Sequence, residues 1–433
     1  MEKEKRSFSY RVVKGYFRYI INGLYYRKFY SIDTQNIPED GTPVLMVSNH
    51  QFCLNDALGV LLSVNDRKMH FIARANAFDI HPLFAKFMLW AGVLPAFRMM
   101  HEGEDALDNN KNTFHLTEQN LLDGRSILLY PEAGHQTRHW LGTFAYGYTR
   151  MAFEAAEKTG FEKEIFILPS CNHYSYYFGM RNDMLIRFGT PISIKPWYEL
   201  YKTKPRTAWR EVNQLVRQQI RSMMLDIQDL EHYDDIDFLR QSQFGKDFAR
   251  SLGKDPDVLP EKLEADKELV ARLADKQVQY DDVRELREAM AAHGLTDRQF
   301  RHRPWPIGKL LLLTLMLPLA ILGVWPALPT WFISEHFSNR MEDRMFQGSF
   351  LLAIFCLVML PLSTLITLLA EWPFIGAWAL LHAAALPILC VFEWNWFQFL
   401  QKAIAELRYR RYGAAIRPLR ERVFQRIKDL IIL

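Results

Sequence analysis

Three long stretches without a charged side chain, all near the C-terminus, constrain this chain most. They run over residues 310–333, 349–370 and 374–392. At about 20 residues each, all three are long enough to cross a hydrocarbon layer of ~30 Å as helices. A soluble protein has no need of three such helices. The sequence therefore predicts an integral membrane protein in which residues 301–433 form a helical membrane region with a basic tail.

The first apolar stretch is interrupted by prolines, which remove helix hydrogen bonds. They are Pro318, Pro326 and Pro329. We therefore expect this stretch to form a re-entrant or interfacial hairpin, and the other two to form a pair of spans with Glu371 near the far interface. The basic clusters at 301–309 and 408–428 both favour the cytoplasmic side, which agrees with an even number of crossings.

Positive charge gathers at both ends of the chain, although the formal net charge is only +4. Residues 1–30 hold eight Lys or Arg against two acids, and residues 400–433 hold nine against three. The modest total argues against a nucleic-acid partner, while the two ends are candidates for an anionic membrane surface. Residues 8–29 predict a basic aromatic helix lying in the interface, or alternatively an amphipathic helix packed on the next domain.

Short apolar runs alternate with helical patterns across residues 31–205, which indicates an α/β domain. The runs expected to be strands are 43–48, 69–73, 93–96, 126–130, 165–169, 185–188 and 192–194. Residues 206–300 follow as a charged helical segment. Four cysteines in 433 residues exclude a disulfide-dense scaffold. The expected fold is thus an α/β domain, then a charged helical segment, then a C-terminal helical membrane region.

A histidine and an aspartate follow the first of these strands. His50 comes directly after residues 43–48, and Asp56 lies six positions further on. Six helical residues place two side chains about 240° apart, so we expect a loop between them, with Asn55 as the N-cap of the next helix. The carboxylate could then bond one imidazole nitrogen and leave the other to take a proton from a hydroxyl. The alternative is a histidine that only caps a strand end.

Two later segments place polar groups where a ligand could lie. Gly92 and Arg98 follow an apolar helical pattern, and an arginine suits bidentate contact with phosphate, although it could equally be a solvated surface charge. Glu132 and Gly134 follow the run 126–130, at the strand end where α/β sheets bind ligands.

Two other chemistries are weaker. Cys53 could act as a nucleophile, but a buried inert thiol is the ordinary state of such a residue. A metal site of Glu132, His135 and His139 lacks any compact ligand motif. No metal is expected.

The order of these blocks resembles the glycerolipid acyltransferase family, the lysophosphatidate and glycerol-3-phosphate acyltransferases, over about residues 40–195. The matching blocks are His50 with Asp56, Gly92 with Arg98, Tyr130-Pro131-Glu132 with Gly134, and Ile167-Leu168-Pro169. In that family the first block is Asn-His, four residues, Asp. This chain has five intervening residues, which resembles the fungal-type glycerol-3-phosphate branch. Asn55 stands at the strict family spacing but lacks the charge.

The resemblance implies that His50 and Asp56 are catalytic. The residues carried over to substrate binding are Arg74, Gly92, Arg98, Glu132, Gly134, Arg138 and Pro169. Backbone amides near Gly134 are expected to hold the oxyanion.

The implied reaction moves a fatty acyl group from acyl-CoA or acyl-carrier protein to lysophosphatidate or glycerol 3-phosphate in phospholipid synthesis. His50 is the general base, no cofactor is needed, and the catalytic domain lies on the cytoplasmic face of the membrane. The partners are a membrane lipid acceptor, the acyl donor and the anionic membrane surface. Two alternatives stay open: an acyltransferase for a lyso-ornithine or lyso-glycine lipid, and a non-catalytic lipid-binding scaffold.

Overall fold

The computed structural model forms two compact units. Unit 1 comprises residues up to 177 together with 182–226, and unit 2 comprises 178–181 and residues from 227 onward. The residues described are 7–64, 68–79, 82–96, 105–132, 134, 138–276, 278–301, 304–340 and 344–432.

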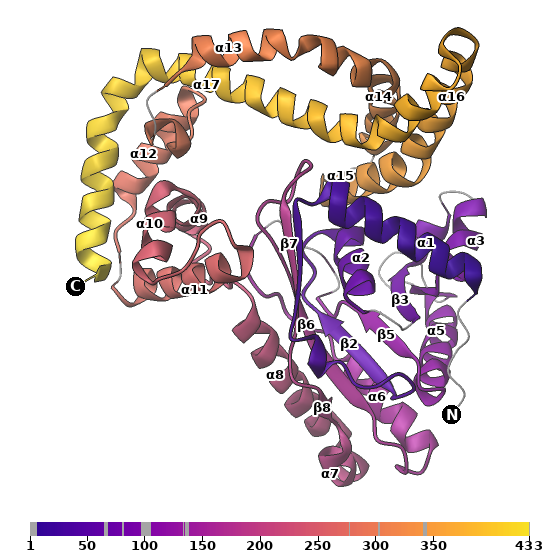
Figure 1. The fold of residues 1–433 in the computed structure, drawn as a ribbon. Coiled ribbons are helices and arrows are strands. Elements are labelled where there is room, and N and C mark those ends of the chain that lie inside the picture. Colours follow the sequence, from indigo (N-terminus) through magenta and orange to yellow (C-terminus); the bar gives the residue numbers. More distant parts are fainter. Residues whose placement is uncertain are drawn as a thin grey trace. The chain divides into compact units, whose positions relative to one another are not determined.

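Unit 1 is built on a sheet with the strand order β1-β7-β6-β2-β5-β3-β4, and β8 pairs with β6 (Figure 1). The strands are β1 Lys28–Ile32, β2 Val44–Ser48, β3 Met69–Arg74, β4 Val93–Ala96, β5 Ser126–Leu129, β6 Phe166–Tyr174, β7 Asp183–Phe188 and β8 Ile192–Ser193. Strands β6, β2, β5, β3 and β4 pair in parallel, whereas β7 and β8 run antiparallel to β6. The α/β fold class is confirmed.

Strand β2 lies in the middle of this sheet, and its side chains are buried on both faces of the sheet. Leu45 and Val47 join an apolar cluster with helices α5 Asp105–Leu122, α6 Gly147–Lys158 and α8 Pro205–Met223. The opposite face is covered by α2 Cys53–Ser63, where a Cβ at Gly59 would collide with Met184 and Ile186 of β7. Gly59 therefore lets α2 approach the sheet closely. Parallel β5, β2 and β6 end at one edge, which is where the site forms.

Helix α8 was expected to belong to the charged helical segment, but it packs on unit 1. Its side chains Val212, Val216 and Ile220 are fully buried in the cluster that covers the sheet. The helix is strongly charged on its outer face only, so an abundance of charge did not reveal its apolar stripe. Unit 1 consequently extends to residue 226 rather than 205.

The basic N-terminal helix is shorter than expected. It consists of α1 Phe8–Tyr19 and a π-helical turn, Ile20–Tyr25, and the chain then enters β1 at Lys28. Two of its cations turn inward, because Lys14 Nζ donates to the carbonyl of Val64 at 2.6 Å and Arg18 donates to that of Leu62 at 3.2 Å. These carbonyls end helix α2 and have no helical partner. The helix thus packs on unit 1 while Phe8 and Val12 stay exposed.

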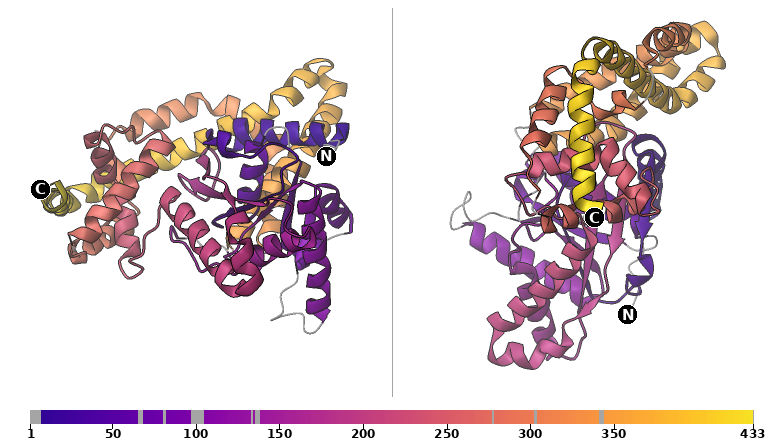
Figure 2. Two further views of the ribbon diagram at one scale, coloured as in Figure 1. Left: turned by 90° about the horizontal axis from the view of Figure 1, so that it is seen from below. Right: turned by 90° about the vertical axis from the view of Figure 1, so that its left-hand side faces the viewer.

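Unit 2 is helical, and its long last helix can be followed in Figures 1 and 2. The helices are α9 Tyr233–Gln241, α10 Gln243–Ser251, α11 Leu259–Asp275, α12 Asp281–Ala292, α13 Pro306–Leu315, α14 Leu317–Ser338, α15 Arg344–Ile354, α16 Leu360–Ile375 and α17 Trp378–Ile432. A π-helical turn, Phe355–Met359, joins α15 to α16.

The charges of the helical segment are largely paired within unit 2. Buried Asp235 accepts from Arg284 and Arg287, and buried Arg240 donates to Asp266 at 3.0 Å. Buried ions need such partners, because an unpaired charge in the interior is strongly destabilising.

Three helical stretches are long and apolar enough to cross a membrane: Pro306–Pro326, Met345–Ile375 and Trp378–Ile431. The first apolar stretch was expected to be broken into a hairpin by its prolines. Helix α14 instead continues through Pro326 and Pro329. How many of the three cross stays a prediction. The turn between α16 and α17 lies at Gly376, whose φ is +54°.

A histidine on α17 repairs the backbone defect at Pro326. A proline has no N–H, so the carbonyl of Leu322, four residues earlier, lacks its helical donor. His382 Nε2 lies 2.9 Å from that oxygen, and its Nδ1 lies 2.7 Å from Oε2 of Glu371. The proline is thus tolerated inside α14 because a side chain of α17 supplies the missing hydrogen bond.

Candidate active site

His50 and Asp56 meet at the carboxyl end of β2. Asp56 lies in the first turn of α2, and its Oδ2 is 2.8 Å from His50 Nδ1. The same oxygen accepts from the backbone N–H groups of Gln51 and Phe52, at 2.8 and 2.9 Å. One carboxylate therefore shapes the whole loop and holds the imidazole. Asn55 was expected at the N-cap of helix α2, but the N-cap is Phe52 and Asn55 lies inside the first turn.

Asn55, the other candidate partner for His50, faces elsewhere. Its amide donates to the hydroxyl of Tyr26 at 2.9 Å. The loop can tighten in this way because Cys53 adopts φ +44°, a left-handed conformation that a residue other than glycine rarely takes. Cys53 itself is buried, with 7% of its surface exposed.

Tyr174 holds the second oxygen of Asp56, and no motif in the sequence pointed to this residue. Tyr174 is the last residue of β6, and its hydroxyl donates a hydrogen bond to Asp56 Oδ1 over 2.5 Å. Burial, followed by the charge of Asp56, raises the pKa of Tyr174 well above its usual value. The phenol therefore stays protonated and remains a donor. With both oxygens bonded, the carboxylate has one fixed orientation.

His50 is held from its ring face as well. Its ring stacks on that of Tyr130, with centroids 4.2 Å apart and planes 18° from parallel. Because Nδ1–H donates to a carboxylate, the neutral imidazole carries its lone pair on Nε2, on the other side of the ring. The side chain of His50 is 19% exposed, so this nitrogen belongs to a ring that remains accessible.

Glu132 supports His50 through the backbone. Its Oε1 accepts from the N–H of His50 and its Oε2 from the N–H of Gly142, each at 2.9 Å. Burial raises the pKa of Glu132 above its usual value, although these two bonds and the nearby His50 oppose the shift. Glu132 was predicted to bind substrate, but both of its oxygens bond to the protein, and it ties the His50 loop to residues 138–146.

Two residues that were predicted to bind substrate, Gly92 and Pro169, lie in strand contacts of the sheet. Gly92 adopts φ +90°, and a Cβ there would lie 2.8 Å from the carbonyl of Met69, so the glycine lets β4 approach β3. Pro169 lies inside β6, opposite Val47 of β2. Neither position reaches the His50 loop through any described bond.

The remaining predicted residues lie around the same sheet edge or outside the described part. Arg74 ends β3, Gly134 has open space where a Cβ would stand, and Arg138 is half-buried in the following loop. Arg98 lies outside the described residues, as does His135.

A second polar cluster, which the sequence did not single out, adjoins the His50 loop. The hydroxyl of Tyr177 donates to Gln51 Oε1 at 3.1 Å and lies 3.2 Å from Nδ1 of buried His139. The ring centroids of His139 and His173 lie 5.3 Å apart. Within the described residues, no three His, Cys, Asp or Glu side chains come together as a metal site.

Comparison with known proteins finds similarity over the part of the chain that contains this site. The family model described as Acyltransferase matches residues 28–172. The chain is 33% identical over 135 residues to the chloroplastic 1-acyl-sn-glycerol-3-phosphate acyltransferase LPAT1 of Arabidopsis thaliana, covering 30% of this chain and 34% of the relative. It is 33% identical over 135 residues to the chloroplastic enzyme BAT2 of Brassica napus, covering 30% and 35%.

The chain thus spans about a third of the length of these curated relatives. Among solved structures, the acyltransferase PlsC of Thermotoga maritima aligns with 14% identity and a TM-score of 0.37, over 49% of this chain and 78% of that one. Residues 28–172, which contain His50, Asp56 and Glu132, thus match the Acyltransferase model, and this part of the chain is similar to 1-acyl-sn-glycerol-3-phosphate acyltransferases.

Proposed function

We propose that this protein is a membrane-bound O-acyltransferase that moves a fatty acyl group from a thioester to the hydroxyl of a glycerol-phosphate-type acceptor, lysophosphatidate or glycerol 3-phosphate. The observation that carries the proposal is the His50–Asp56 pair at the carboxyl end of β2, inside a domain of the matching family. Apolar helices long enough to span a bilayer would keep this domain beside its amphiphilic substrate.

In the proposed reaction His50 Nε2 removes the proton of the acceptor hydroxyl, while Nδ1–H donates to Asp56. The alkoxide attacks the thioester carbonyl of acyl-CoA or acyl-carrier protein and forms a tetrahedral intermediate. This intermediate collapses to the new ester and expels a thiolate, which takes the proton from His50. Asp56 stabilises the transient imidazolium with its negative charge.

The other roles are assigned by the family resemblance. Backbone amides near Gly134 would hold the oxyanion. Arg98, with Arg74 or Arg138, would hold the acceptor phosphate through paired N–H groups. The basic clusters that flank the apolar helices support a cytoplasmic orientation of this domain. The intact bonding of Asp56 favours an enzyme over a degenerate lipid-binding scaffold, whose site would have no need of it.

The test is acyl transfer by the full chain in proteoliposomes, with lysophosphatidate or glycerol 3-phosphate and a fatty acyl thioester. His50→Ala is expected to lower the rate by a factor of about 10³ or more, as loss of a general base and its partner does in acyl transfer. His115→Ala, an exposed histidine on α5, is the matched control and should keep full activity. Retained activity in His50→Ala, with normal membrane insertion, would refute the proposal.

An acceptor panel separates the substrate classes. If a lyso-ornithine or lyso-glycine lipid is acylated and neither phosphate acceptor is, the assignment of a glycerol-phosphate acceptor is wrong while acyl transfer itself stands.

A further inference from the structure

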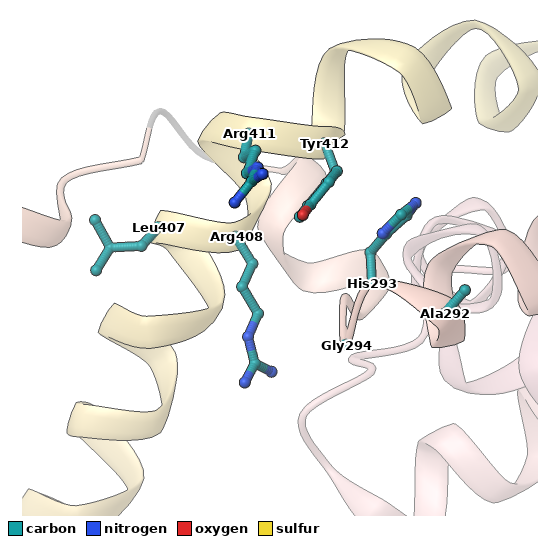
Figure 3. Close-up of a pocket in the computed structure, with 7 residues that line it drawn as sticks. All are labelled: Ala292, His293, Gly294, Leu407, Arg408, Arg411 and Tyr412. Atoms are coloured by element: carbon teal, nitrogen blue, oxygen red, sulfur yellow. The ribbon is translucent and has the colours of Figure 1, made fainter.

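A pocket of about 580 Å³ lies within unit 2, between the end of α12 and the basic part of α17 (Figure 3). Arg408, Arg411 and Tyr412 of α17 line it on one side. His293 and Gly294, which follow α12, line it on the other. None of these residues belongs to the site built around His50, so the acyl-transfer chemistry leaves the pocket unexplained.

The two arginines of the pocket differ from Arg420 and Arg426, which lie further along α17. Arg420 pairs with Asp297, and Arg426 pairs with Asp282. No acidic partner occurs for Arg408 or Arg411 within the part of the chain that the structure describes. Two guanidinium groups one helical turn apart therefore share a pocket that holds no compensating negative charge.

The shape of the pocket is held by its own residues. The His293 and Tyr412 rings stack with centroids 4.1 Å apart and planes 10° from parallel. The Arg411 guanidinium carbon lies 5.2 Å from the Tyr412 ring centroid. Gly294 has φ +59°, and a Cβ there would lie 2.5 Å from Nη1 of Arg408. The missing side chain thus makes room for the guanidinium.

The pocket offers donors that match a phosphate group. An arginine presents a planar fork of N–H groups that binds phosphate oxygens in pairs and accepts no hydrogen bond. The Tyr412 hydroxyl adds a donor on the same wall and the His293 imidazole adds one on the opposite wall. In Figure 3 the Arg408, Arg411 and Tyr412 side chains extend to one side of α17. A phosphate would neutralise the two charges that the protein leaves uncompensated.

The position along α17 favours a ligand near the membrane surface. The charge-free run of the helix ends at Phe392, and the aromatic-rich stretch after Glu393 ends at Leu400; Arg408 lies eight residues, or about 12 Å, beyond Leu400. The headgroup layer is about 5–8 Å thick on each side of the hydrocarbon, and a long arginine side chain can reach several ångströms toward it. The phosphate of an anionic lipid is therefore within reach, and so is a soluble phosphate.

We propose that the pocket formed by His293, Gly294, Arg408, Arg411 and Tyr412 is a phosphate-binding site, filled by the headgroup of an anionic phospholipid or by a water-soluble phosphate. This inference goes beyond the proposed acyl transfer and does not depend on it, because the pocket shares no residue with the His50 site.

The experiment measures phosphate binding by the full-length protein in neutral detergent. One arm uses native mass spectrometry with phosphatidic acid against phosphatidylcholine. The other follows the thermal midpoint in inorganic phosphate against chloride at equal ionic strength, since a ligand of the folded state raises the midpoint. The test variant is Arg408→Gln with Arg411→Gln. The control is Arg422→Gln with Lys428→Gln, which removes the same charge from exposed positions of the same helix.

We expect the pocket variant to lose at least about tenfold in affinity, since each charge-assisted contact is worth that much, and the control to change by less than about twofold. Saturable binding of inorganic phosphate that the pocket variant loses identifies a soluble source. Binding that requires phosphatidic acid identifies a headgroup. Equal binding by wild type and pocket variant, or an equal loss in the control, would overturn the proposal.

Discussion

Tyr174→Phe removes a single hydroxyl from the support of the His50–Asp56 pair. That hydroxyl donates to Asp56 Oδ1 at 2.5 Å, and Tyr174 is 1% exposed. The phenylalanine ring keeps the contacts with Tyr26 and Phe52, whose centroids lie 6.2 and 5.6 Å away. The variant therefore isolates one hydrogen bond to a buried carboxylate.

The expected cost follows from that bond. A hydrogen bond to a charged group contributes about 1.5–3 kcal/mol, so the free energy of unfolding of unit 1 should fall by this amount. For a domain of this size the thermal midpoint then falls by about 3–12 °C. Asp56 also loses one of the bonds that orient it. We expect kcat to fall about tenfold, equivalent to about 1.4 kcal/mol, with KM unchanged because Tyr174 is buried.

The stability difference between wild type and variant also depends on pH. Burial and the charge of Asp56 raise the pKa of Tyr174 well above its usual 10.0. The unfolded chain therefore loses this proton first, so the hydroxyl's contribution is fully present below pH 10 and declines as pH rises toward the folded-state pKa. The wild type should lose its advantage over Tyr174→Phe in alkaline solution.

The measurements are thermal unfolding of the detergent-solubilised protein from neutral to alkaline pH, and steady-state acyl transfer in proteoliposomes. Tyr146→Phe is the control, because it removes a hydroxyl from a residue that is 48% exposed. If Tyr174→Phe matches wild type in both midpoint and kcat, the assignment of Tyr174 as a residue that positions Asp56 is wrong.

Three further substitutions test other contacts. Glu132→Gln presents an amide NH₂ group to one of two backbone N–H donors, that of His50 or that of Gly142. The free energy of unfolding should therefore fall by about 1–3 kcal/mol, and kcat should fall as well. An unchanged denaturant unfolding curve would contradict this contact. Gly59→Ala forces a methyl group between α2 and β7 and should destabilise by about 1–3 kcal/mol, as read from the thermal midpoint. His382→Ala should lower the midpoint in detergent more in wild type than in a Pro326→Ala background, where the Leu322 carbonyl regains its helical donor; an equal loss in both would exclude this coupling.

Local patterns in the sequence predicted most of unit 1. The buried runs 43–48, 69–73 and 126–130 match β2, β3 and β5, because continuous apolar runs are typical of parallel strands covered on both faces. The order of the short motifs predicted the similarity that the Acyltransferase model and the curated relatives show over this domain. The same resemblance pointed to the pair of His50 and Asp56 before any geometry was known.

The sequence did not reveal contacts between parts of the chain that are far apart. Residues 8–29 were expected either to lie in the membrane interface or to pack on the next domain, and the sequence did not show that Lys14 and Arg18 donate to carbonyls at the end of α2. Helix α8 was assigned to a separate segment because the stretch 206–300, taken as a whole, is helical and heavily charged. In each case the partner lies far away in the chain, and composition does not report it.

What the sequence alone determined is the kind of protein: an α/β domain similar to acyltransferases, followed by helices apolar enough for a membrane. Only the tertiary structure could decide which groups hold the reactive histidine. Tyr174 and Asp56 are 118 residues apart, and Glu132 is 82 residues from His50. Periodicity records which face of a strand or helix is buried, whereas these contacts depend on how β2, β5 and β6 lie side by side and bring their ends to one edge of the sheet.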